Sequence, residues 1–469
     1  MWNTKEKNNQ KKIQLLGQGT YGCVYRPALH CKTMKPISKR YVSKIQKKEE
    51  MVSGEIEFGN RIKENVRNYS LYFAPILETC DIRISQLDDE QLNQCEPIQK
   101  NKNEAFSSNK MEYVGKQTLG EYFEHVLEKA HSTRDMQRFL MKLVDTHIYL
   151  LNSAEQLNHQ NIIHLDIKGN NVMYHENNNV FVIIDFGLSV DSRSLELTNY
   201  TKEGDKSPFG ILVDSYMPWN IDILLLSYIA RQIQPKGKNN EYEYREGGRF
   251  DEKITDTKPM KQMVTRFVKD NRLFKNPCFS EKELLEFEKK YHAYIQTWRE
   301  KTWREAWNEL QKHKKSWDAY SINVMFLRLL MSTNITNFLK ENTKEMRKMP
   351  EPLLNTIKIA FTGNTSRMET VNFFKQYIGY LKTTLLSTPT EHCVPLDCIS
   401  KIKAIFNRVP VEMMEKWEGY MKNSIVTSKN RKKMSQNGKE TTLQNIREGD
   451  KLLRRMLEKK VLPPVAPAQ

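Results

Sequence analysis

The stretch 162–173 carries side chains whose types and spacing suit one kind of chemistry. The pattern His-x-Asp-x-Lys-x-x-Asn places a carboxylate at Asp166, an ammonium group at Lys168 and an amide at Asn171. An apolar run then leads to a second carboxylate, Asp185, in an Asp-Phe-Gly sequence. Phosphoryl transfer needs a carboxylate to accept a hydroxyl proton, a cation near the moving phosphoryl group, and oxygen ligands for magnesium. The spacing therefore predicts a phosphoryl-transfer site.

A glycine-rich segment near the N-terminus is the first element that such a site requires. It consists of Gly17, Gln18, Gly19, Thr20, Tyr21, Gly22, Cys23 and Val24. Glycines permit a tight turn between strands and let backbone N–H groups approach phosphate oxygens. A dinucleotide-binding turn and an ordinary hairpin are the alternatives. The segment continues into a strand rather than into a helix, which argues against the dinucleotide-binding form.

Two further positions complete the expected phosphate site. Lys44 follows an apolar strand pattern after the glycine-rich segment, and we expect it to contact the phosphates. Its expected partner is a glutamate on the next helix, either Glu55 or its competitor Glu57.

The segment 109–115 predicts a strand. The motifs above resemble those of protein kinases, and this resemblance implies that the strand leads into a hinge between two lobes and that Met111 borders the nucleotide pocket. It also implies that the backbone of residues 112–114, which include Glu112 and Val114, faces the adenine edge. Apolar residues recur every three to four positions from 135 to 157, which predicts a buried amphipathic helix. This helix precedes the segment 162–173, which we call the catalytic loop.

Residues 13–385 resemble the eukaryotic-type protein kinases, and Lys168 resembles their serine/threonine branch. The segments Gly-Thr-Tyr-Gly-Cys-Val-Tyr and Ser-Trp-Asp-Ala-Tyr-Ser are similar to kinases of large cytoplasmic DNA viruses such as iridoviruses. The resemblance implies an α+β, bilobal fold with a small β-rich N-lobe and a larger helical C-lobe. It also implies ATP and Mg²⁺ as cofactors and protein hydroxyls as acceptors. In this scheme Asp166 and Lys168 are catalytic, and Asn171 and Asp185 hold the metal.

The chain departs from this family pattern at three places. Leu165 replaces the arginine that commonly binds a phosphate on the activation segment, so we expect activity that does not depend on such a phosphate. No Ala-Pro-Glu sequence follows Gly187, and the segment 216–219 is the nearest substitute. The aspartate that anchors the catalytic loop from a C-lobe helix is either Asp318 or Asp222.

The expected domain boundaries follow from these positions. Residues 1–115 form the N-lobe, and 116–425 form the C-lobe with a helical insertion at about 230–315. Residues 426–469 form a basic, flexible tail. Aromatic residues between 287 and 317 alternate with charged ones, so they form either a packed helical face or a nucleic-acid stacking surface. The tail is a candidate for binding nucleic acid or another anionic surface.

The bulk composition restricts the class of protein. The 74 basic and 57 acidic residues give a net charge of +17, which favours anionic partners. Seven cysteines without repeated C-x-x-C pairs argue against a disulfide framework or a zinc site and favour a reducing compartment. No apolar run approaches the roughly 20 residues that a transmembrane segment requires. We therefore expect an intracellular, cytoplasmic protein, located in the host cytoplasm or the virion if the viral resemblance holds.

The sequence predicts an ATP-dependent serine/threonine protein kinase. The alternative is a pseudokinase scaffold that keeps the fold and binds nucleotide or partners without efficient catalysis. The missing Ala-Pro-Glu sequence supports the alternative, whereas the presence of every expected catalytic side chain supports the enzyme.

Overall fold

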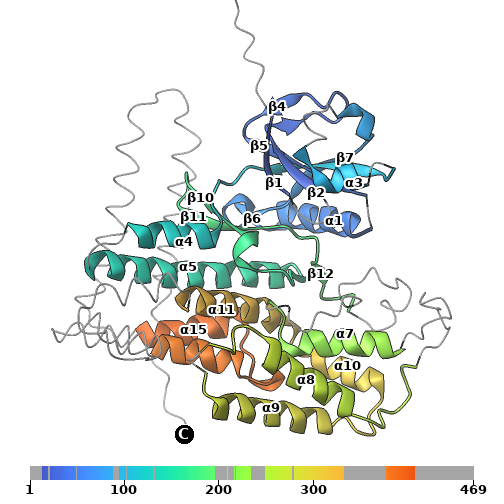
Figure 1. Cartoon of the computed structure of the whole chain (residues 1–469), viewed down its shortest axis with the longest axis vertical. Helices are drawn as coiled ribbons and strands as arrows, with labels where there is room; N and C mark the ends of the chain where they lie inside the picture. The colour runs from blue at the N-terminus through green and yellow to red at the C-terminus, as the bar shows by residue number, and fades with distance from the viewer. Residues whose placement is uncertain are drawn as a thin grey trace, which may run out of the picture. The chain divides into compact units, whose positions relative to one another are not determined.

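An antiparallel sheet of five strands forms the N-terminal part of the computed structural model of this chain (Figure 1). The strand order is β1-β2-β5-β8-β7. The bounds of these strands are β1 Gln14–Gln18, β2 Gly22–Arg26, β5 Tyr41–Lys47, β7 Ile76–Ile82 and β8 Phe106–Glu112. In the central strand β5, Lys44 pairs with Val24 on one side and Asn109 on the other. The sheet therefore fixes the Lys44 backbone from both edges.

The structure describes residues 13–18, 22–48, 50–87, 94–101, 103–129, 133–195, 209, 216, 218–233, 249–276, 279–331 and 376–406. All of them belong to one compact unit, Met1–Arg408. The second unit, Val409–Gln469, lies outside the described residues, and so does the expected basic tail.

Helix α1 (Glu50–Asn65) packs against the sheet at β7. Its side chains Phe58 and Ile62 are buried in this contact, and Glu55 is buried on the same helix. Three shorter elements complete the N-terminal part. They are β3 (Ala28–Leu29) and β4 (Pro36–Ser38), which form a hairpin, and α3 (Glu96–Lys100).

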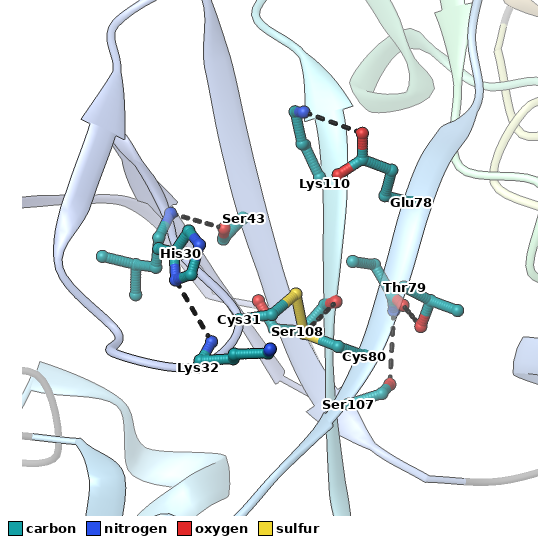
Figure 2. The surroundings of a disulfide bond; sticks show 12 residues. His30, Cys31, Lys32, Ser43, Glu78, Thr79, Cys80, Ser107, Ser108 and Lys110 are labelled. Atoms are coloured by element: carbon teal, nitrogen blue, oxygen red, sulfur yellow. Dashed lines mark hydrogen bonds and ion pairs between the residues drawn. A yellow bond between two sulfur atoms is a disulfide. The ribbon is translucent and has the colours of Figure 1, made fainter.

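Disulfide bonds join strands of this sheet to neighbouring segments. Cys23 bonds to Cys95, and Cys31 bonds to Cys80 (Figure 2), while a third disulfide joins Cys393 and Cys398 in the C-terminal part. The prediction that disulfides are absent was therefore wrong. The folded chain brings together cysteines that are 72 and 49 residues apart in the sequence, which a count of cysteines does not reveal. Cys278 lies outside the described residues.

Two small sheets hold the catalytic loop between them. β10 (Val172–His175) pairs with β11 (Val180–Ile184), which pairs in parallel with β6 (Phe73–Ala74). β9 (Ile162–Ile163) pairs with β12 (Val190–Asp191). Because the loop starts directly after β9 and ends at β10, both of its ends are fixed by strand pairing.

Helices make up most of the remaining described chain. They include α4 (Leu119–Glu128), α5 (Thr133–His159), α11 (Trp317–Leu330) and α15 (Pro395–Phe406). Figure 1 shows α5 between α4 and α11, and α5 contacts both. The apolar face expected for α5 is buried at Leu143, Val144 and Leu151. The prediction of an α+β fold with a β-rich N-terminal region and a helical C-terminal region is confirmed.

Among the residues that the structure describes, four α-helices lie between Trp219 and α11. They are α7 (Ile221–Ile233), α8 (Lys258–Asp270), α9 (Glu281–Gln296) and α10 (Trp303–Gln311). Ser280 caps α9 and Thr302 caps α10, each by accepting a backbone N–H bond in a capping box. The aromatic residues of this region are buried, namely Phe287, Tyr291, Trp298, Trp303, Trp307 and Trp317. They form a packed face, so they are not available as a surface for stacking nucleic-acid bases.

In the described part of the chain, no helix has both the length and the apolar character needed to span a membrane.

Candidate active site

In the catalytic loop, polar side chains form hydrogen bonds and an ion pair with Asp166. Asn171, which ends the short 3-10 helix η3 (Gly169–Asn171), donates from Nδ2 to Asp166 Oδ2 at 2.7 Å and to the Asp166 carbonyl at 3.0 Å. Lys168 Nζ lies 2.9 Å from the Asp166 carboxylate. The three side chains that the motif predicted to act together are thus in direct contact.

His164 organises the backbone of the same loop. Its Nδ1 accepts the Asp166 N–H at 3.2 Å, and its Nε2 lies 3.2 Å from the Ile184 carbonyl. The ring is fully buried and packs 4.9 Å from the ring of Phe186, which is also buried. These contacts tie the catalytic loop to the end of β11, where Asp185 begins the Asp-Phe-Gly turn.

Asp318, at the start of α11, holds the backbone of the catalytic loop. Its two carboxylate oxygens accept the backbone N–H groups of His164 at 2.8 Å and Leu165 at 3.0 Å. Leu165 has a φ of 60°, a conformation that costs a non-glycine residue about 1–2 kcal/mol. The Trp219 Nε1 donates to the Leu165 carbonyl at 2.8 Å, so both polar backbone groups of this strained residue are held.

Asp222, the alternative anchor, has a different environment. It is fully buried on α7, lies 3.3 Å from His392 Nδ1 and accepts the Tyr291 hydroxyl at 3.3 Å. It therefore connects α7 to α9 and to the segment before α15. Of the two aspartates left open by the sequence, Asp318 contacts the catalytic loop.

Lys44 joins the N-terminal sheet to the Asp-Phe-Gly turn. Its Nζ lies 2.8 Å from Asp185 Oδ1 and 3.5 Å from Glu55 Oε1. Burial alone would lower the pKa of Lys44, but the two carboxylates outweigh it and raise the pKa to about 12. Lys44 is therefore a fixed cation at neutral pH. Glu57 instead pairs with Arg61 at 2.8 Å, so Glu55 is the partner.

Asp185 keeps its charge in this arrangement. Burial raises its pKa, but the contacts with Lys44 outweigh burial and the net shift of the pKa is downward. The residue has a φ of 68°, so the chain turns sharply between β11 and Gly187. Lys44 donates to Asp185 Oδ1, and Asn171 bonds to Asp166 through Nδ2, so these contacts do not use Asp185 Oδ2 or Asn171 Oδ1.

The glycine-rich segment is described on both sides of its turn. Gln18 pairs with Cys23, while Gly19, Thr20 and Tyr21 lie outside the described residues. A Cβ on Gly22 would lie 2.0 Å from the Ile45 carbonyl oxygen, so only glycine fits this close approach of β2 to β5. The Cys23 side chain is buried in its disulfide with Cys95.

The predicted hinge lies at the end of β8. Met111 is buried in a small cluster with Val42 and Ile76, against which Val24 and the ring of Tyr113 pack. Glu112 pairs with Arg40 at 3.4 Å, and the Tyr113 N–H donates to the Arg40 carbonyl at 2.9 Å.

Two residues after Tyr113, Gly115 approaches the chain after the catalytic loop. A Cβ on Gly115 would lie 2.1 Å from the Tyr174 carbonyl oxygen, so a larger residue would collide there. Val114, directly before it, is partly exposed.

Comparison with known families is consistent with this geometry. Residues 10–203 match the family model described as "Protein kinase domain". This part of the chain is therefore similar to protein kinase domains. No curated protein matches the chain.

The kinase-domain match ends before several residues that complete the site. Asp318, Trp219 and Tyr216 all contact the catalytic loop from beyond residue 203. The Tyr216 hydroxyl donates to Asp166 Oδ1 and accepts a bond from Lys168 Nζ at 2.9 Å. Sequence reasoning used Tyr216 only to mark the missing Ala-Pro-Glu sequence and did not assign its hydroxyl to the site.

Proposed function

We propose that this chain is an ATP-dependent serine/threonine protein kinase that transfers the γ-phosphate of Mg-ATP to protein hydroxyls. The observation that carries the proposal is the double ion pair of Lys44 with Glu55 and Asp185. It brings a fixed cation from the N-terminal sheet to the carboxylate that follows the catalytic loop. A lysine that only stabilises the fold would need one carboxylate partner rather than two.

The acceptor side of the reaction is assigned to Asp166 and Lys168. Asp166 would orient the acceptor hydroxyl and take its proton, a role in which position matters more than pKa. Lys168 Nζ, 2.9 Å from that carboxylate, would offset the negative charge of the transferred phosphoryl group. Lys168 also supports the serine/threonine assignment through the family resemblance.

The donor side is assigned to Lys44 and to the oxygens of Asn171 and Asp185. An amide oxygen and a carboxylate suit Mg²⁺, which takes oxygen ligands and usually keeps one or two from the protein. When bound, Mg²⁺ would neutralise charge on the ATP phosphates. Lys44 would hold the phosphates, and the buried Glu55 would keep the Lys44 side chain extended toward them.

The test is transfer of labelled γ-phosphate from ATP to casein by the full chain and by Asp166→Asn. We expect the variant to lose about two decades of rate or more, since removing a positioned catalytic group costs a few kcal/mol. Asp251→Asn, an equivalent change at a side chain that is 74% exposed, is the matched control and should retain the rate. Equal labelling by Asp166→Asn and wild type would refute the assignment.

Residue specificity is read from the labelled substrate. Acid hydrolysis of the casein should release phosphoserine and phosphothreonine. Phosphotyrosine alone on the casein would refute the serine/threonine assignment while leaving phosphoryl transfer intact.

A further inference from the structure

Tyr216 places a hydroxyl at the position that an acceptor hydroxyl must reach. The oxygen donates its proton to Asp166 Oδ1 and lies 2.9 Å from Lys168 Nζ. These are the two side chains that the proposed function assigns to the acceptor. The same ammonium group lies 5.5 Å from the centroid of the Tyr216 ring, so ring and hydroxyl both contact the catalytic pair.

Neighbouring contacts hold Tyr216 in this place. The Trp219 N–H donates to the Tyr216 carbonyl at 3.0 Å, and the Trp219 ring packs edge-on against the Tyr216 ring with centroids 5.1 Å apart. Trp219 itself donates to the Leu165 carbonyl, and Ser321 on α11 donates to the Pro218 carbonyl at 2.5 Å. The catalytic loop therefore holds Trp219, which contacts Tyr216, and α11 holds Pro218.

The phenol is in the state that an acceptor requires. Partial burial, followed by the nearby Asp166 carboxylate, raises the pKa of Tyr216 above its usual value. The oxygen thus keeps its proton at neutral pH, and the hydrogen bond directs that proton to the group proposed as the base.

We propose that Tyr216 is a site of intramolecular autophosphorylation, an inference that rests on the proposed function. The phenol oxygen forms a bond to the γ-phosphorus of ATP as the bond from that phosphorus to the β,γ-bridging oxygen breaks. The proton passes to Asp166, and ADP leaves with the bridging oxygen. Presentation by the chain itself replaces recognition of a separate substrate, so a tyrosine is accepted despite a serine/threonine preference for other proteins.

Phosphorylation would change what occupies the site. A phosphate carrying about −1.5 to −2 charges on this oxygen would be repelled by the Asp166 carboxylate and attracted by the Lys168 ammonium group. The esterified oxygen has no proton, so the hydrogen bond from Tyr216 to Asp166 would be lost.

The test is phosphopeptide mapping of the full chain after phosphatase treatment and incubation with Mg-ATP. Tryptic cleavage after Lys206 and Arg231 yields the peptide 207–231, which contains Tyr216 and also Tyr228. Fragmentation should place the phosphate on Tyr216, at a first-order rate that is independent of protein concentration. Tyr216→Phe and Asp166→Asn should lack this modification, whereas Tyr228→Phe, a change within the same peptide, should keep it.

Two results would overturn the inference in distinguishable ways. If casein is labelled while Tyr216 stays unmodified, the hydroxyl only positions Asp166 and Lys168, and the proposed function stands without this site. If neither casein nor Tyr216 is labelled, the proposed function fails and the inference fails with it. A labelling rate proportional to protein concentration would refute the intramolecular reaction.

Discussion

Replacing Asp318 by asparagine should loosen the catalytic loop without touching any group that contacts substrate. The carboxylate accepts two backbone N–H bonds, from His164 at 2.8 Å and Leu165 at 3.0 Å. An asparagine can accept only one of them and presents a donor to the other. A lost hydrogen bond to a charged group and a buried N–H left unpaired each cost about 1–3 kcal/mol. We therefore expect a loss of about 2–6 kcal/mol in the free energy of unfolding.

The effect on catalysis should exceed what this destabilisation alone would produce. Leu165 has a φ of 60° and precedes Asp166 directly, so release of its N–H lets the backbone relax and displaces the base. A displacement of about 1 Å can cost on the order of 100-fold in rate. We expect kcat to fall by that order, with a small change in the KM for ATP because Lys44 and Asp185 keep their ion pair.

Asp222→Asn is the matched control for this experiment. Asp222 is equally buried and has polar partners, but none of them belongs to the catalytic loop. Chemical denaturation should show a loss of stability in both variants, whereas steady-state kinetics should show the fall in kcat only in Asp318→Asn. Equal kcat values in the two variants would refute the anchoring role of Asp318.

Three further predictions follow from the contacts of the N-terminal part. Glu55→Gln should lower kcat/KM for ATP about tenfold or more, because Lys44 loses a hydrogen bond to a charged partner worth about 1.5–3 kcal/mol. Glu57→Gln is the control and should match wild type in the same assay. Non-reducing peptide mapping should recover Cys23 linked to Cys95, and free thiols at both positions would contradict the fold. Replacing both cysteines by alanine should lower the free energy of unfolding by about 4 kcal/mol, because the disulfide closes a loop of 72 residues. Partial burial alone would raise the pKa of Asp191, but hydrogen bonds from Arg193 and Arg61 lower it to about 2. The stability that ionised Asp191 contributes is complete above pH 4, roughly the pKa of aspartate in the unfolded chain, and is lost as the pH falls toward 2. Arg61→Ala should therefore lose less unfolding free energy than wild type between about pH 4 and pH 2. An equal loss in both proteins would contradict the pairing.

The sequence predicted the contacts within the catalytic loop because its residues are close neighbours in the chain. Asp166, Lys168 and Asn171 lie within six positions, so their spacing alone brings them together. Lys44 was predicted from its place after the glycine-rich segment. The fold class followed from the resemblance to protein kinases that these motifs carry.

Contacts between distant segments could not be predicted from local spacing. The choices between Glu55 and Glu57 and between Asp318 and Asp222 depend on which helix face meets the site, and both members of each pair have suitable chemistry. The disulfide of Cys23 with Cys95 depends on the packing of α3 against β2, two elements that are far apart in the chain. The Tyr216 hydroxyl reaches Asp166 from 50 positions away, and no motif marks it.

The most direct test of whether Lys44, Asn171 and Asp185 form one nucleotide site is a binding measurement. Calorimetry would measure the binding of ATP to the Asp166→Asn variant, with and without Mg²⁺. This variant should bind without turnover, because it keeps the donor-side groups and lacks the base. We predict Mg²⁺-dependent binding that weakens about tenfold or more when Asp185→Asn is added, since a charged metal ligand is lost. Binding that is indifferent to Mg²⁺ and to Asp185, or no binding at all, would contradict the site described here.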